Sequence, residues 1–391
     1  MKGLFARHAI ASFGPHWLFP EATSRAAAFP NRRPSRLREK VRAECPRLPG
    51  VYGMADARGE WIYVGKAKNL RARLLSYFRT NSREPKAGHI LHETRLLAWE
   101  VGTSEFAALL RELELIRRWQ PRFNVQGQPR RPRRVYVCLG RRPASYAFLA
   151  WKPASTAQVV YGPVPAGNTA REAVRRVNDW YRLRDCPQAQ TMAFADQHEL
   201  FPMVRAPGCI RHEIGSCLAP CAAVCTLTDY TAATTAARAF LDGTDASPLQ
   251  GLERDMHAAA AAMQFERAAA LRDRWRALHW LTRHLARLRE AGAHSFVYPV
   301  TGHDGQECWY LIRRGRVVGA LPRPADEEGR RHAAAVLEEV FAPGRIVPGP
   351  LSLAETDGVL LVASWFRRHA AEKGRTLDPG TVAACGLAGA C

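Results

Sequence analysis

The sequence predicts an α+β protein made of several domains. With 391 residues, the chain is long enough for two or three domains that each bury a core of their own. Hydrophobic residues make up 47% of it, and short aromatic or β-branched runs occur among stretches with helical spacing. No internal repeat is found. We therefore expect small sheets flanked by helices.

Changes in composition along the chain divide it into five predicted segments. We expect residues 1–44 to be a basic, disordered arm, because the stretch is rich in arginine and poor in acids. The segments that follow are a small α/β domain (45–127), a linker and cysteine-cluster domain (128–247), a helical hairpin (248–290) and an α/β region of unassigned role (291–391).

The small domain is predicted from alternation, helical spacing and capping residues. Asn69 and Ser104 stand directly before two apolar-periodic stretches, where they can cap the first turn of a helix. The expected elements are a hairpin of strands at 48–54 and 60–65, a helix at 70–78, a strand at 96–102 and a helix at 105–120.

The remaining elements follow from the same patterns. Seven arginines, no acid and several Gly or Pro residues predict a basic loop over 121–142. Apolar residues at helical spacing predict a helix pair over 248–290 that turns near Gln264. The other expected elements are strands at 135–140, 146–151, 159–162, 295–300 and 307–321, and helices at 169–183, 327–341 and 359–373.

The charge balance favours a polyanionic partner. Lys and Arg number 57 against 36 acids, a net charge of +21, which is typical of proteins that bind nucleic acid. A GC-rich genome is the alternative source of such a composition. We find no apolar run of the roughly 18–20 residues that a membrane helix needs and no secretory signal, so we expect a cytoplasmic protein without a membrane partner.

One acid in the small domain is a candidate metal ligand. Glu114 has Arg118 four residues on, the ordinary helical ion pair, whereas Glu112 has Ile116 at that position. An acid on an apolar-flanked side of a helix is costly unless a cation answers its charge. A metal ion could do so, and a solvated side chain is the alternative.

Cations and phenols gather near the same place. Arg73 and Tyr77 lie four residues apart on the polar side of the helix at 70–78, and Lys66 lies just ahead of it, where helix N–H groups favour anions. Tyr52 and Tyr63 fall on the two arms of the hairpin. An aromatic cross-strand pair is the alternative reading of these two tyrosines.

Four cysteines have the character of a metal site. Cys186 precedes Cys209, Cys217 and Cys221, and thiolates in a reducing compartment more often hold metal than form disulfides. The spacing fits either Zn²⁺ or an iron–sulfur cluster. Cys225 is a further candidate ligand, and buried reduced thiols are the alternative.

The motifs "GVY" (50–52), "YVGKAKNLRARLLSYF" (63–78) and "SEFAALLRELELIRRWQPRFNV" (104–125) resemble the GIY-YIG nuclease domain in its UvrC version. The resemblance implies a small sheet flanked by helices and a metal-dependent DNA endonuclease. It implies that Glu112 binds one Mg²⁺ or Mn²⁺ and that Tyr63 is the general base. The other catalytic residues that it implies are Tyr52, Lys66, Arg73, Tyr77 and Asn124.

Two later stretches resemble further parts of UvrC. "RLRDC" (182–186) and "GCIRHEIGSCLAPC" (208–221) resemble its cysteine region, which implies a 4Fe–4S cluster. "LERDMHAAAAAMQFERAAALRDRWRAL" (252–278) resembles the UVR motif, through which UvrC meets the damage-loading subunit UvrB. The residues that this places at the partner surface are Phe265, Ala268, Ala269, Arg272 and Asp273.

The resemblance covers roughly residues 45–290, and no second nuclease or tandem DNA-binding hairpins are recognised after it. We therefore expect a Cho-like, single-nuclease homologue that cuts damaged double-stranded DNA once, 3′ to a lesion, in nucleotide excision repair. Two alternatives remain: a GIY-YIG nuclease outside repair, and a cleavage-inactive adaptor for UvrB and DNA. The sequence does not determine an oligomeric state. The arginines expected to contact DNA phosphates are Arg130, Arg131, Arg133 and Arg134.

Overall fold

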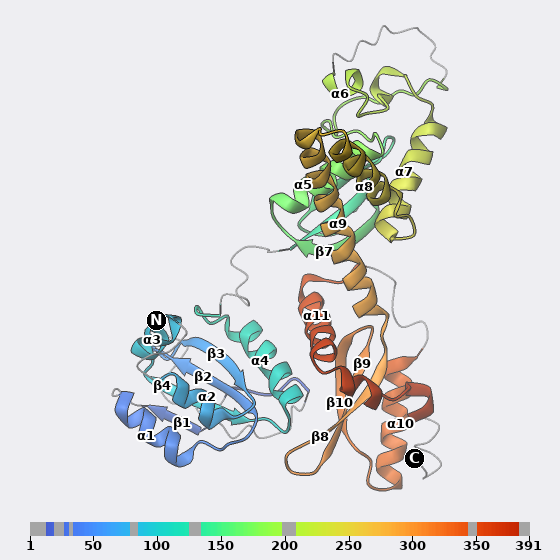
Figure 1. The fold of residues 1–391 in the computed structure, drawn as a ribbon. Coiled ribbons are helices and arrows are strands. Elements are labelled where there is room, and N and C mark those ends of the chain that lie inside the picture. The colour runs from blue at the N-terminus through green and yellow to red at the C-terminus, as the bar shows by residue number, and fades with distance from the viewer. Residues whose placement is uncertain are drawn as a thin grey trace, which may run out of the picture. The chain divides into compact units, whose positions relative to one another are not determined.

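Two units make up the fold, which comes from a computed structural model that describes residues 13–18, 27–30, 34–78, 85–124, 134–197, 209–342 and 350–382 (Figure 1). Unit 1 combines residues 1–131 with 294–345 and 361–391. Unit 2 combines residues 132–293 with 346–360. Each unit combines parts of several of the five predicted segments.

The first half of unit 1 is an antiparallel four-stranded sheet with helices around it. The strand order is β1 (Ala27–Pro30), β4 (Leu96–Val101), β2 (Gly50–Ala55) and β3 (Trp61–Ala67). The predicted hairpin is β2–β3, and both predicted caps form: Asn69 accepts from the Ala72 N–H and Ser104 from the Ala107 N–H. The helices are α1 (Pro34–Glu44), α2 (Leu70–Ser76), α3 (Pro85–Glu93) and α4 (Glu105–Trp119).

The expectation of a disordered arm is wrong for the described part of residues 1–44. In α1, Leu37 and Val41 lie one turn apart and are buried in the same core cluster as Tyr52. Phe13 is fully buried, with its ring centroid 4.9 Å from that of Trp61 on the other side of β2 and β3. Apolar residues at this spacing bury a helix face, which a count of charges does not reveal.

The second half of unit 1 is a three-stranded antiparallel sheet that packs against α4. Its order is β10 (Arg316–Pro322), β9 (Glu307–Arg313) and β8 (Phe296–Thr301), followed by α10 (Glu327–Phe341), the part of α11 (Leu353–Arg368) from residue 361 onward and the 3₁₀ helix η2 (Ala370–Arg375). Phe106 of α4 is fully buried against Tyr298, Tyr310 and Trp365, with ring centroids 5.0–5.2 Å away. The region of unassigned role thus shares a core with a helix of the small domain.

Unit 2 holds a second three-stranded antiparallel sheet and a group of helices. The strand order is β6 (Tyr146–Ala150), β5 (Arg134–Gly140) and β7 (Ala157–Pro165). The helices are α5 (Asn168–Trp180), α6 (Ile210–Glu213), η1 (Pro220–Ala222), α7 (Leu227–Asp242), α8 (Ser247–Ala261) and α9 (Phe265–Ala293).

The strand expected at 135–140 is confirmed as β5, which covers residues 134–140 of the stretch 121–142 that was described as a basic loop. The helical hairpin is not a separate domain, because Leu278, Leu281 and Leu285 of α9 lie in the same core cluster as the β5 side chains. The predicted turn between α8 and α9 near Gln264 is confirmed.

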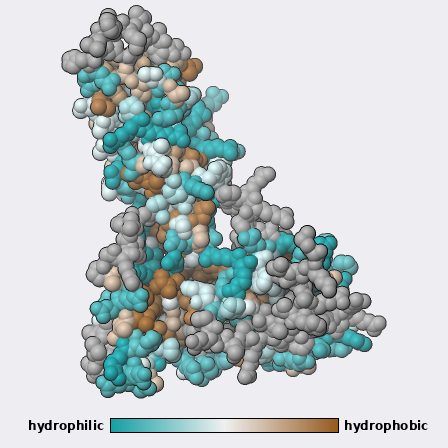
Figure 2. All heavy atoms as spheres, turned by 180° about the vertical axis from the view of Figure 1, so that it is seen from behind, coloured by the Kyte–Doolittle hydropathy of each residue, from teal (hydrophilic) through white to brown (hydrophobic). Residues whose placement is uncertain are grey.

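Within the described ranges, every helix is too short or too polar to span a bilayer. Hydrophilic and hydrophobic residues are interspersed on the face drawn in Figure 2.

Candidate functional site

Three tyrosines from β2, β3 and the end of α2 form one cluster. The ring centroids of Tyr52, Tyr63 and Tyr77 lie 5.9–6.2 Å apart. Tyr52 sits opposite Gly65 in the β2–β3 register, and a Cβ at residue 65 would come within 2.6 Å of the Tyr52 hydroxyl oxygen. A glycine there leaves room for the phenol to lie across the strand.

Arg73 is tied into this cluster from α2. Its Nε donates to the Tyr52 hydroxyl at 3.1 Å, and its guanidinium lies 5.2 Å from the centre of the Tyr77 ring. The hydroxyls of Tyr52 and Tyr77 are hydrogen-bonded to each other at 2.9 Å. Both tyrosines are buried, whereas Tyr63 is only half-buried. Tyr63 is therefore the phenol that a ligand reaches.

Burial also separates the tyrosines by chemistry. It raises the pKa of both the Tyr52 and the Tyr77 hydroxyl above the usual value near 10, mainly because the buried phenolate would lose its solvation. These two hydroxyls stay protonated at neutral pH and act as hydrogen-bonding groups.

Glu112 faces the same site from α4. Its Oε1 accepts the backbone N–H of Lys66 at 3.0 Å. Burial raises the pKa of the Glu112 carboxyl, while the Lys66 N–H, the Lys66 charge and the Arg73 charge oppose that rise. A half-buried carboxylate that nearby cations keep ionised can also bind a divalent metal ion.

Glu114 points into a different set of contacts, as its spacing from Arg118 predicts. Its two oxygens accept from Arg118 and Arg111, each at 2.7 Å. Arg111 is buried and also bonds to both oxygens of Glu100. The same arginine donates to the carbonyls of Gly14 and Pro15, which fastens residues 13–18 onto α4. Sequence reasoning missed this network, which needs partners nearly 100 residues apart.

Lys66 has an acidic partner that the sequence analysis did not single out. Its Nζ lies 3.5 Å from Oε1 of Glu105, and the other oxygen of Glu105 lies 2.9 Å from Nζ of Lys68. Glu105 is in the first turn of α4, two turns from Glu112. The capping serine at 104 followed by an acid was the available signal.

Asn124 holds the strand that carries Tyr63. Its side-chain oxygen accepts the Val64 N–H at 2.8 Å, and its side-chain nitrogen donates to the Val64 carbonyl at 2.6 Å. The neighbouring Phe123 N–H donates to the Ile62 carbonyl at 2.9 Å. β3 is an edge strand, so this segment satisfies backbone groups that the sheet leaves open.

The arrangement brings an acid, two cations and an accessible phenol into one site on unit 1. Such a set can bind a divalent cation together with an anionic ester, and it offers a group that can exchange a proton. The six predicted catalytic residues and Glu112 all belong to this neighbourhood, with Asn124 acting on the backbone behind it.

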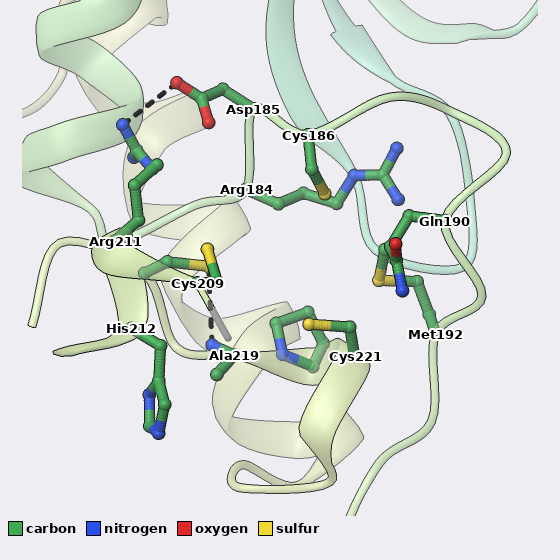
Figure 3. A pocket seen from close by; sticks show the side chains of 12 residues that line it. Arg184, Asp185, Cys186, Gln190, Met192, Cys209, Arg211, His212, Ala219 and Cys221 are labelled. Carbon is green, nitrogen blue, oxygen red and sulfur yellow. Dashed lines mark hydrogen bonds and ion pairs between the residues drawn. The ribbon is translucent and has the colours of Figure 1, made fainter. Parts of the chain in front are cut away.

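The four predicted thiol ligands line one cavity of about 80 Å³ in unit 2 (Figure 3). Cys186 follows α5 in the chain, Cys209 precedes α6, Cys217 lies between α6 and η1, and Cys221 lies in η1. Cys225 does not line this cavity and is buried in the unit 2 core instead. Burial raises the pKa of the Cys217 and Cys221 thiols.

Donor chemistry fits a soft metal centre, because four thiols from two segments share one hollow. In the described parts of the chain, however, no three His, Cys, Asp or Glu side chains stand in the geometry of a metal site.

The residues predicted to contact the partner and DNA differ in exposure and in their ion pairs. Phe265, at the start of α9, is 62% exposed, and the neighbouring Met263 is 71% exposed. Arg272 and Asp273 are exposed and paired with each other at 3.2 Å. Arg134 is paired with Asp357 at 3.3 Å. Arg130, Arg131 and Arg133 lie outside the described residues.

Comparison with known families gives three matches in chain order. Residues 48–125 match the UvrC-like GIY-YIG domain, residues 136–240 the middle domain of the UvrC/Cho excinucleases, and residues 247–279 the UvrB/UvrC motif.

Individual relatives are named as UvrC proteins. UvrABC system protein C of Alcanivorax borkumensis is 32% identical over 308 residues, 75% of this chain and 47% of the relative. Its counterpart in Desulforudis audaxviator is 31% identical over 86% of this chain and 55% of the relative. The chain thus spans about half the length of these curated relatives. A solved structure, the magnesium-bound GIY-YIG N-terminal endonuclease domain of UvrC from Thermotoga maritima, is 37% identical and covers 23% of this chain and 97% of that one, with a TM-score of 0.21.

Proposed function

This chain is UvrC-like in its GIY-YIG domain, its middle domain and its UVR motif, and from that premise we propose that it is a metal-dependent DNA endonuclease of nucleotide excision repair. It hydrolyses one phosphodiester, 3′ to a lesion, in damaged double-stranded DNA. The observation that carries the proposal is that Glu112, Arg73 and the tyrosine cluster occupy one site.

Glu112 would hold one Mg²⁺ or Mn²⁺. Mg²⁺ commonly takes only one or two protein carboxylates and completes its shell with water and substrate phosphate, so a lone acid suffices. The Thermotoga domain is described as bound to magnesium as its catalytic cation. The chemistry that such an ion supplies is neutralisation of charge on the phosphate and activation of water.

The protein side chains then take separate parts. Tyr63 accepts a proton from the attacking water, because it is the accessible phenol of the cluster. Arg73 and Lys66 bind the phosphate oxygens. Tyr52 and Tyr77 orient Arg73, and Asn124 fixes the β3 backbone on which Tyr63 stands.

The cysteine cavity would hold a 4Fe–4S cluster, with Zn²⁺ as the alternative, on Cys186, Cys209, Cys217 and Cys221. Support comes from the shared cavity and from the thiol donor set. Protein purified without oxygen should be brown and contain iron. Stoichiometric zinc without iron would replace the cluster by a zinc site.

The helical hairpin would dock a UvrB-like subunit through the exposed end of α9. Phe265 and Met263 are large apolar side chains left in solvent at the turn, and such residues are typical of protein contacts. Arg272 and Asp273 are exposed and continue this surface along α9, whereas Ala268 and Ala269 are half-buried and contribute to it only in part.

A nicking assay on a lesion-bearing duplex, with and without UvrB, tests the function. Glu112→Gln keeps the shape of the side chain, and we expect a loss of about 10²–10⁴-fold, because a metal's contribution of several kcal/mol disappears. Glu60→Gln, on an exposed glutamate of the hairpin turn, is the control and should cut like the parent.

The outcomes separate the alternatives. Tyr63→Phe should lose more activity than Tyr52→Phe if the exposed phenol moves the proton. Cutting that ignores UvrB would favour a nuclease outside repair. A parent protein that stays inert with every divalent metal, yet binds UvrB and DNA, would favour the adaptor. Undiminished cutting by Glu112→Gln would refute the metal assignment.

A further inference from the structure

Arg184 is a buried cation beside the cysteine cavity. Its side chain is among the largest fully buried ones, at 2% exposure, and Figure 3 shows it beside Cys186. One guanidinium nitrogen donates to the Pro187 carbonyl at 3.4 Å and to the Gln188 side-chain oxygen at 3.2 Å. The guanidinium also lies 4.8 Å from the centre of the Tyr146 ring.

Among the described residues, no carboxylate forms an ion pair with the Arg184 guanidinium. The other buried arginine, Arg111, bonds to Glu100, and the half-buried Arg211 lies 2.8 Å from Asp179 and 2.9 Å from Asp185. Arg184 has only neutral partners, and its Nε has no hydrogen-bond partner at all. An arginine cannot lose its proton inside a protein, so the charge stays.

A buried cation without a counter-charge is strongly destabilising, because it has lost its solvation by water and gained nothing in return. Asp185 also lines the cavity, but it is paired with Arg211 at 2.9 Å, so the four thiols are the remaining source of negative charge beside Arg184. Four neutral thiols would leave the guanidinium without a counter-charge. Four thiolates around a metal centre would carry a net negative charge and answer it, because their four charges exceed those of Zn²⁺ or of an oxidised 4Fe–4S core.

We propose that Arg184 is the built-in counter-charge of an anionic four-thiolate centre: its charge retains the metal and, where the centre is a 4Fe–4S cluster, favours the reduced, more negative form of that cluster. This inference rests on the proposed cysteine centre. It names a positioning residue, because Arg184 supplies no ligand atom. In a one-electron reduction no bond is made or broken, so the added negative charge is the quantity that the guanidinium stabilises.

The test compares three variants with the parent, all purified without oxygen as the full chain. Arg184→Gln removes the charge, Arg184→Lys keeps it, and Arg171→Met removes an exposed arginine of α5 from the same unit. Bound iron and zinc are measured per chain before and after a chelator challenge. The reduction midpoint is measured by titration with dithionite, and folding is checked by circular dichroism.

We expect Arg184→Gln to retain at least tenfold less metal after the challenge, or to make the reduction equilibrium at least tenfold less favourable, which is about 59 mV. Arg184→Lys and Arg171→Met should stay close to the parent. If Arg184→Gln fails to fold while Arg184→Lys folds and keeps the metal, the need for charge is supported as well.

Three results would overturn the inference. One is a folded Arg184→Gln with the parent's metal content and midpoint. Another is an Arg184→Lys variant as defective as Arg184→Gln, because the effect would then come from packing. The third is a parent without iron or zinc, which would remove the cysteine centre as well. The nicking assay of Glu112→Gln is scored separately, so none of these results decides the nuclease proposal.

Discussion

Asn124→Ala should loosen the strand that carries Tyr63. The substitution removes two hydrogen bonds to Val64, at 2.8 and 2.6 Å, on the open edge of β3. With a net contribution of about 0.5–1.5 kcal/mol per bond, local opening of β3 becomes about 1–3 kcal/mol easier. At 1.36 kcal/mol per factor of ten, the Val64 amide should exchange its hydrogen roughly 5–150 times faster.

Hydrogen exchange followed by mass spectrometry on peptides that cover β3 measures this change in the full chain. Asn69→Ala is the matched control, because it removes the single bond from the Ala72 N–H at 2.9 Å and so affects the first turn of α2. Exchange in β3 should stay unchanged in the control. Nicking by Asn124→Ala should fall together with the protection of β3.

The opposite pattern would refute this account of Asn124. If Asn124→Ala abolishes nicking while Val64 exchanges as slowly as in the parent, the amide contacts the substrate and does not act through the backbone. Asn124→Asp separates the two hydrogen bonds, because it keeps the acceptor for the Val64 N–H and loses the donor to the Val64 carbonyl.

Three further predictions follow from burial and charge. Phe106→Ala should lower the free energy of unfolding by about 3–5 kcal/mol in a urea titration. Phe265 is 62% exposed, so Phe265→Ala should change that free energy by less than about 0.5 kcal/mol. Equal changes in the two variants would contradict the packing of α4. Burial, with the charges of two arginines, lowers the pKa of His16 to about 4, so docking of residues 13–18 should weaken as pH falls from 6.5 toward 4, by up to about 3 kcal/mol. Hydrogen exchange of the Leu18 amide should report that loss, and His16→Gln should abolish its pH dependence. Because burial raises the pKa of Glu112, Glu112→Gln should stabilise the metal-free protein at pH 7. Added Mg²⁺ should raise the thermal unfolding midpoint of the parent but not that of the variant.

Local sequence features determined many elements of unit 1. The hairpin of β2 and β3, the caps at Asn69 and Ser104, and the bounds of α10 depend on residues within a few positions of one another. The same is true of the choice between Glu112 and Glu114, since the ion pair of Glu114 spans one helical turn. Short-range rules of capping, alternation and helical spacing are sufficient for such features.

Contacts between distant residues were decided only by the tertiary structure. Sequence spacing could not reveal that Asn124 bonds to Val64, 60 residues earlier, or that Phe106 packs against β8, β9 and α11. Nor could it reveal that Arg184 is buried without an acid beside the four thiols. The sequence by itself determined which chemical groups the chain carries and which local elements hold them. Packing decided which groups meet, because burial and the pairing of charges depend on side chains that approach one another only after the chain has folded.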